Sequence, residues 1–153
     1  MLAKLKNIFS GKETADVRTQ DPEEQHVATA ALLIEAALSD ETYCEEEKEM
    51  VQSLLQRHYK LSDEEISAVM TEAEAAHKNA DQILYFTRTV KDTVEYDDRV
   101  HVIEMLWELA YADGEISDYE ANLIRRVCGL IYVDDKESGR VRKAVQARLG
   151  QSS

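Results

Sequence analysis

The sequence contains little that breaks a helix or cross-links a fold. Its 153 residues include one proline, five glycines and two cysteines. So few turn-forming residues disfavour hairpins and sheets, and two cysteines are too few for a disulfide framework. We therefore expect one small globular domain in which Cys44 and Cys128 are reduced thiols.

Long apolar segments are also lacking. No apolar run approaches the roughly 18 residues that a membrane span requires. Residues 1–10 do not contain the apolar core of a secretory signal peptide. We expect a cytoplasmic protein.

Basic residues are scarce compared with acidic ones. The chain has 18 Lys and Arg against 31 Asp and Glu, and its formal net charge is −13 at pH 7. The acidic excess lies in the middle of the chain, because residues 1–12 and 136–148 are both basic. A negative surface repels phosphate backbones. The composition therefore disfavours nucleic acid as a partner and favours cations and basic proteins.

Apolar residues recur at spacings of three and four along almost the whole chain, which is typical of helices. We predict an all-α fold in which Asp21 and Pro22 start the first helix and capping boxes at Ser62 and Ser117 start two later ones. The segment 96–112 is apolar on most sides and should lie centrally. About seven helices are expected, over residues 22–38, 44–59, 62–77, 80–92, 96–112, 117–132 and 135–148.

The chain repeats itself after 73 residues. This shift superposes Glu35 on Glu108, Asp40 on Asp113, Glu47 on Glu120 and Tyr59 on Tyr132. Each half is a helix, an acidic turn and a second helix. We predict two pseudo-symmetric helix-turn-helix repeats, about residues 22–78 and 95–148. They form one helical domain, residues 21–149, after a basic tail and linker, residues 1–20.

The second acidic turn has half of a known calcium-binding pattern. Asp113, Gly114 and Glu120 have the spacing of the second half of an EF-hand loop. The first half is absent, because Leu109 and Tyr111 occupy the positions of the first oxygen ligands. What remains is one acid at the end of a helix and another in the first turn of the next helix, in both repeats.

Two interpretations of these acids remain open. If the turns face each other, Asp40, Glu47, Asp113 and Glu120 supply carboxylates to one site, which suits Ca²⁺ or Mg²⁺ better than Zn²⁺. Alternatively the acids act locally, because Asp followed by Gly is ordinary turn chemistry and Glu120 can complete a capping box with Ser117.

Residues 106–116, Leu-Trp-Glu-Leu-Ala-Tyr-Ala-Asp-Gly-Glu-Ile, followed by Glu120, resemble the signature of the TerB tellurite-resistance family. The resemblance covers roughly residues 22–149. It implies an all-helical, non-enzymatic bacterial domain that acts in stress-response complexes near the inner membrane with other tellurite-resistance proteins. It also implies metal chelation at the repeat turns, by Asp40, Glu47, Asp113 and Glu120. Glu41 stands where the family has glycine, so we expect the first turn to bind a cation less well.

Two other functions stay open beside a cation-binding scaffold. One is a metal-free interaction domain that recognises a basic partner through its negative surface. The other is a helical enzyme that uses His101, Glu104 and Glu108, which share one helical face. For these three residues we favour an exposed polar stripe.

The N-terminal segment has a short basic amphipathic pattern. Leu2, Leu5, Ile8 and Phe9 alternate with Lys4 and Lys6. We predict weak contact of residues 2–9 with an anionic membrane surface, where each basic residue contributes about 1 kcal/mol. The alternatives are an unstructured tail and a flap that docks on the acidic body of the same chain.

Overall fold

The computed structural model describes residues 23–38, 44–76, 82–112 and 116–149. Within these ranges the chain forms seven helices and no strand, which confirms the predicted all-α class. The helices are α3 (Glu24–Ala37), α4 (Glu45–Tyr59), α5 (Asp63–Ala76), α6 (Gln82–Thr93), α7 (Tyr96–Tyr111), α8 (Asp118–Leu130) and α9 (Asp135–Arg148).

The helix starts follow the capping signals in the sequence. The Glu65 and Glu120 amides each donate to the hydroxyl of the serine three residues earlier at 3.0 Å, which confirms the two predicted capping boxes. The first helix differs, because α3 begins at Glu24 with Glu23 in the N-cap position. Asp21 and Pro22, the predicted start, lie outside the described residues.

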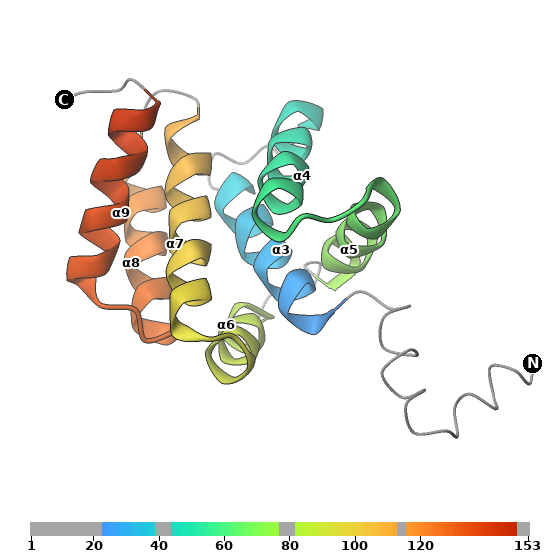
Figure 1. Cartoon of the computed structure of the whole chain (residues 1–153), viewed down its shortest axis with the longest axis horizontal. Coiled ribbons are helices and arrows are strands. Elements are labelled where there is room, and N and C mark those ends of the chain that lie inside the picture. Colours follow the sequence, from blue (N-terminus) through green and yellow to red (C-terminus); the bar gives the residue numbers. More distant parts are fainter. Residues whose placement is uncertain (1–22, 39–43, 77–81, 113–115, 150–153) are drawn as a thin grey trace, which may run out of the picture.

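The segment predicted to be central has more buried residues than any other described helix. Ten of the 16 residues of α7 are buried, and they include the large side chains of Ile103, Met105 and Leu106. Helices α3, α4, α8 and α9 all pack against α7. Figure 1 shows α7 between α9 on one side and α3 and α4 on the other. Helix α7 is apolar on most sides because other helices pack against it on most sides.

The two predicted repeats correspond to α3–α4–α5 and α7–α8–α9. In each, the first helix packs against both the second and the third. Helices α3 and α7 also contact each other and run in the same direction in Figure 1. Their C-terminal ends, which precede the two acidic turns, therefore point to the same side of the molecule. Helix α6 joins the repeats and packs on α3 and α8.

Helix α8 of the second repeat reaches its left-handed end residue one position earlier than a constant shift of 73 from α4 predicts. Its N-cap, Ser117, matches Cys44 at that shift, but the two left-handed residues, Lys60 (φ 56°) and Tyr132 (φ 60°), lie 72 residues apart. Tyr132 therefore has the structural position of Lys60, and its predicted equivalence to Tyr59 is wrong. Tyr59 is half-buried and its hydroxyl hydrogen-bonds that of Thr29 at 3.1 Å, whereas Tyr132 is 67% exposed.

The two cysteines are free thiols, as predicted, with Cys44 exposed and Cys128 buried. Burial raises the pKa of the Cys128 thiol, although a hydrogen bond with Ser138 acts in the opposite direction. A buried thiol with a raised pKa is mostly protonated and therefore a poor nucleophile at neutral pH.

A buried polar contact joins α7 to α9. The indole Nε1 of Trp107 donates to the Ser138 hydroxyl at 3.0 Å, and both residues are buried. The guanidinium of Arg142 lies over the indole, 4.5 Å from its centroid. The hydroxyl thus satisfies a donor that has been removed from water.

We predict that Ser138→Ala lowers the free energy of unfolding by about 1–2 kcal/mol, because the buried indole N–H loses its acceptor. Urea unfolding followed by the fluorescence of Trp107, the single tryptophan of the chain, measures the change. Ser67→Ala, at an exposed serine of α5, is the control and should change stability by less than about 0.5 kcal/mol. Equal effects of the two substitutions would contradict the assignment.

Candidate functional site

The two glutamates of the predicted cation site lie in the first turns of α4 and α8. An Oε1 atom of Glu47 accepts the Cys44 amide at 3.1 Å, and that of Glu120 accepts the Ser117 amide at 3.0 Å. Both side chains therefore cap their own helices, as the local interpretation expected for Glu120. Because a carboxylate can accept an amide at one oxygen and still coordinate an ion, these caps do not decide the cation prediction.

The two aspartates of the predicted site, Asp40 and Asp113, lie outside the described residues. Within the described ranges, no group of three or more His, Cys, Asp and Glu side chains is arranged to hold a metal ion. The four-carboxylate site therefore stays a prediction. Its two halves follow α3 and α7, which lie side by side (Figure 1).

Glu108 is the buried centre of an ion-pair cluster between α4, α7 and α9. Its carboxylate contacts Arg57 Nη1 at 3.3 Å, His58 Nε2 at 3.0 Å and the Arg148 guanidinium. Only 5% of the Glu108 side chain is exposed. Because an ionised carboxylate only accepts hydrogen bonds, the facing nitrogen of His58 must carry a proton.

The cluster keeps Glu108 ionised. Burial alone raises the pKa of a carboxylate. Hydrogen bonds from His58 and Arg148, together with the charge of Arg57, outweigh burial and lower the pKa of Glu108 to about 2. These contacts join the second helix of the first repeat and the last helix of the second repeat to α7.

The predicted polar stripe on α7 is therefore only partly exposed. His101 is exposed and lies 3.5 Å from Asp98, as an exposed stripe predicts. Glu104 is 20% exposed and contacts Arg148 at 3.3 Å. For Glu108 the prediction of exposure is wrong, because α4 and α9 cover this end of the face and bring Arg57, His58 and Arg148 to it.

Glu35, the repeat partner of Glu108, also reaches across to the other repeat. The Tyr119 hydroxyl at the start of α8 donates to Glu35 Oε2 at 3.3 Å. Each repeat thus uses the matched glutamate of its first helix to contact the second helix of the other repeat. The 73-residue match of the glutamates was visible in the sequence, but their partners, up to 84 residues away, were not.

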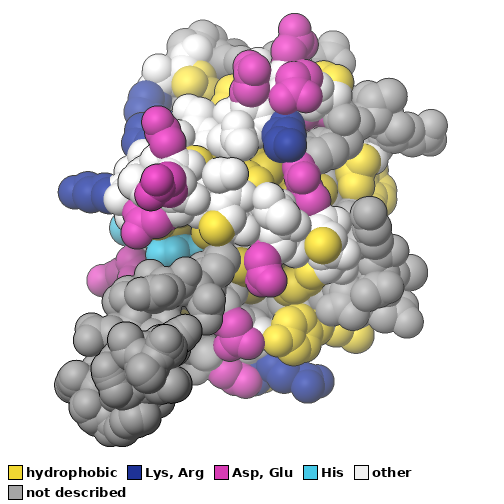
Figure 2. Space-filling view, turned by 90° about the vertical axis from the view of Figure 1, so that its right-hand side faces the viewer, with side chains coloured by type: hydrophobic (Ala, Val, Ile, Leu, Met, Phe, Trp, Pro, Cys, Tyr) yellow, Lys and Arg dark blue, Asp and Glu magenta, His cyan; other side chains and the backbone are white. Residues whose placement is uncertain are grey.

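The surface around these helices is acidic. Figure 2 views the molecule from the side of α5 and shows Asp and Glu side chains spread over a face with few Lys or Arg. The exposed acids of α4 and α5 include Glu45, Glu46, Glu49, Asp63, Glu64, Glu65 and Glu72.

The family model described as tellurite resistance protein TerB matches residues 26–143. The chain belongs to the TerB family. The matched region begins in α3 and ends in α9, so it includes both acidic turns and all of α7. No curated protein and no solved structure matches the chain significantly. In this TerB-family chain, none of the described helices is long and apolar enough to cross a membrane.

We predict that Glu108→Gln destabilises the protein mainly above pH 5. A lowered folded-state pKa adds stability above the unfolded-state pKa of about 4.5, and this stability is lost as the pH falls toward 2. The difference corresponds to about 3 kcal/mol at pH 7.

Urea unfolding of wild type and variant at intervals from pH 7 to pH 2 measures this effect. The gap in unfolding free energy should shrink as Glu108 becomes protonated. Glu104→Gln, one turn earlier and partly exposed, is the control and should cost less than about 1 kcal/mol. A gap that does not vary with pH would show that the glutamine disturbs packing and not an ion pair.

Proposed function

We propose that this TerB-family chain is a non-enzymatic binding domain of bacterial stress-response complexes that holds a divalent cation between its two acidic turns. The observation that carries the proposal is the side-by-side, same-direction packing of α3 and α7. Both helices end on the same side of the molecule, which supports a site shared by the turns that follow them.

The donor set favours a hard cation. Asp40, Glu47, Asp113 and Glu120 offer carboxylate oxygens, which are the ligands that Ca²⁺ and Mg²⁺ prefer. Two such charges about 4 Å apart repel by about 4 kcal/mol at an effective dielectric constant near 20. A bound divalent ion would offset this repulsion and fix the two turns relative to each other.

Replacing Glu47 and Glu120 by glutamine distinguishes cation binding from helix capping. Gln serves at this position of the box as Glu does, but it lacks the charge. At 100 times the dissociation constant, a bound ion should raise the free energy of unfolding by about 2.7 kcal/mol. We expect Ca²⁺ or Mg²⁺ to stabilise wild type in thermal unfolding, and Glu47→Gln with Glu120→Gln to remove most of the increase.

The matched control carries Glu46→Gln and Asp118→Asn, which remove equal charge from the same two helix starts. This variant should keep the full response to the ion. Calorimetry on the same proteins gives the stoichiometry, expected to be one ion per chain. An absent response in wild type, or an equal loss in the control, would contradict a site at the turns.

The acidic face supports a second candidate, a metal-free domain that recognises a basic protein partner. We expect a lysine-rich peptide to bind this chain with an affinity that falls steeply with salt, because exposed charges are screened. Fluorescence anisotropy in the presence and absence of a chelator measures the binding. Chelator-insensitive binding together with no ion response favours this candidate, whereas loss of binding in chelator favours the cation site.

A further inference from the structure

An apolar groove lies between the start of α3, the end of α5 and α6. Its volume is about 390 Å³. Small side chains leave this space open, because alanines line it on α3 and α5 where larger residues would fill it. The apolar lining consists of Val27, Ala28, Ala75, Ala76 and Phe86.

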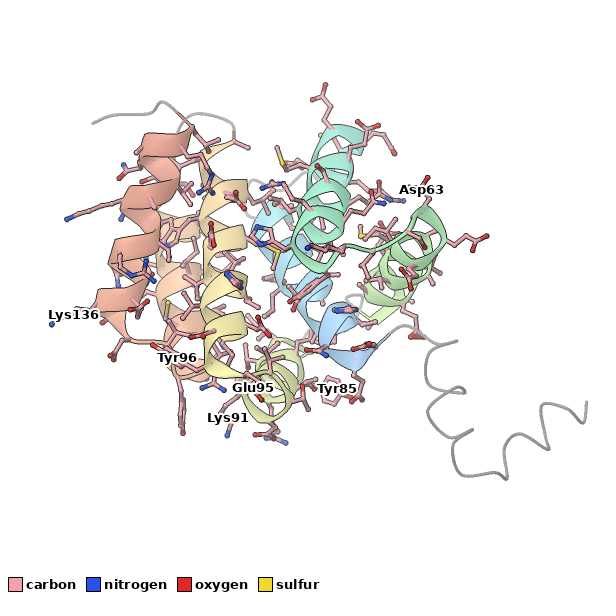
Figure 3. The ribbon with its side chains drawn as sticks, in the orientation of Figure 1. Asp63, Tyr85, Lys91, Glu95, Tyr96 and Lys136 are labelled. Carbon is pink, nitrogen blue, oxygen red and sulfur yellow. The ribbon has the colours of Figure 1, made fainter. Side chains whose placement is uncertain are left out.

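The rim of the groove is polar and negative. Glu24 on α3 and Glu72 on α5 both line it. Tyr85 on α6 is 49% exposed, and its hydroxyl donates to Glu24 Oε2 at 3.3 Å. Figure 3 labels Tyr85 at the lower edge of the molecule, between α6 and the first turn of α3. Beyond the rim, α5 carries further exposed acids (Figure 2).

We propose that residues 1–12 of this chain dock in the groove between α3, α5 and α6. This segment combines apolar residues with three lysines and no acid, so it matches an apolar lining inside an acidic rim. The apolar residues are Leu2, Leu5, Ile8 and Phe9, and the lysines are Lys4, Lys6 and Lys12.

The chain length permits this contact. Ten residues, 13–22, separate the segment from Glu23, the first described residue. An extended chain of ten residues spans up to about 35 Å. Because Glu24 itself lines the groove, the segment needs only a fraction of that reach.

Because residues 13–22 tether the segment to the helical domain, even a weak contact is enough to keep the segment docked most of the time. A short linker gives an effective concentration of about 1 mM. A segment with a local dissociation constant near 0.1 mM would therefore be docked about ten times as often as it is released. The same apolar side chains would be needed to insert into a membrane surface or to occupy the groove of a second copy, so these occupants compete with docking.

Tryptic cleavage of the full-length chain at Lys4, Lys6 and Lys12, followed by mass spectrometry, tests the proposal. Ala75→Tyr places a bulky side chain in the groove at an exposed position, and Ala68→Tyr makes the same change on α5 outside it. We expect cleavage to be about tenfold faster in Ala75→Tyr than in wild type, and unchanged in Ala68→Tyr. Equal rates in all three proteins would overturn the proposal.

Variants of the segment give an independent measurement. Ile8→Ser with Phe9→Ser should release the segment, whereas Asn7→Ser, at a polar neighbour, should not. In ¹H–¹⁵N spectra of the full chain, the double variant should shift the amides of Val27, Ala76 and Phe86, and the control should leave them in place. Unshifted groove amides in the double variant would overturn the proposal. This measurement does not depend on whether Ala75→Tyr or Ala68→Tyr disturbs folding.

Two further conditions identify other occupants. Cleavage that slows only when vesicles of phosphatidylcholine and phosphatidylserine are added would overturn docking and assign the segment to a membrane surface. Protection that rises with protein concentration would overturn it in favour of a second copy. All samples contain chelator, so the result is independent of the cation site.

Discussion

The packing of α7 against both halves of the chain is the constraint on which the rest of the structure depends. Ile103, Met105 and Leu106 are fully buried, and side chains of this size contribute about 1.5–3 kcal/mol each when removed from water. Because α3 lies beside α7, the same contact that builds the core also places the C-terminal ends of both helices, which precede the two acidic turns, on one side of the molecule. Any function shared between the turns therefore depends on an apolar interface away from them.

Glu108 is a buried charge that joins helices of both repeats. A buried carboxylate costs free energy unless it is paired and hydrogen-bonded. Here Arg57 and His58 come from α4 and Arg148 from the end of α9, so one side chain on α7 joins elements of both repeats. Glu35 makes the corresponding contact across the repeats through Tyr119. Matched positions of the two repeats thus place acids at both crossings, and at Glu108 the carboxylate pairs with Arg57 and Arg148.

Acidic and basic residues are concentrated in different parts of this chain. Acids on α4 and α5 form a negative face that continues to the groove between α3, α5 and α6, whereas the N-terminal segment and α9 carry clustered basic residues. Both proposals rest on this separation: cations or basic partners would bind the acidic face, and the chain's own basic segment would bind at the groove. The first follows from the composition, and the second requires the groove that packing leaves open.

The sequence by itself determined the helices and the starts of α5 and α8, because apolar spacing, Ser62 and Ser117 act within a few residues. It also determined the family resemblance, the central position of α7 and the duplicated acids. Only the tertiary structure decided that Glu108 is buried, that Tyr132 corresponds to Lys60 and that small residues leave a groove beside α5. These features arise from contacts between residues far apart in the chain, for which local periodicity carries no signal.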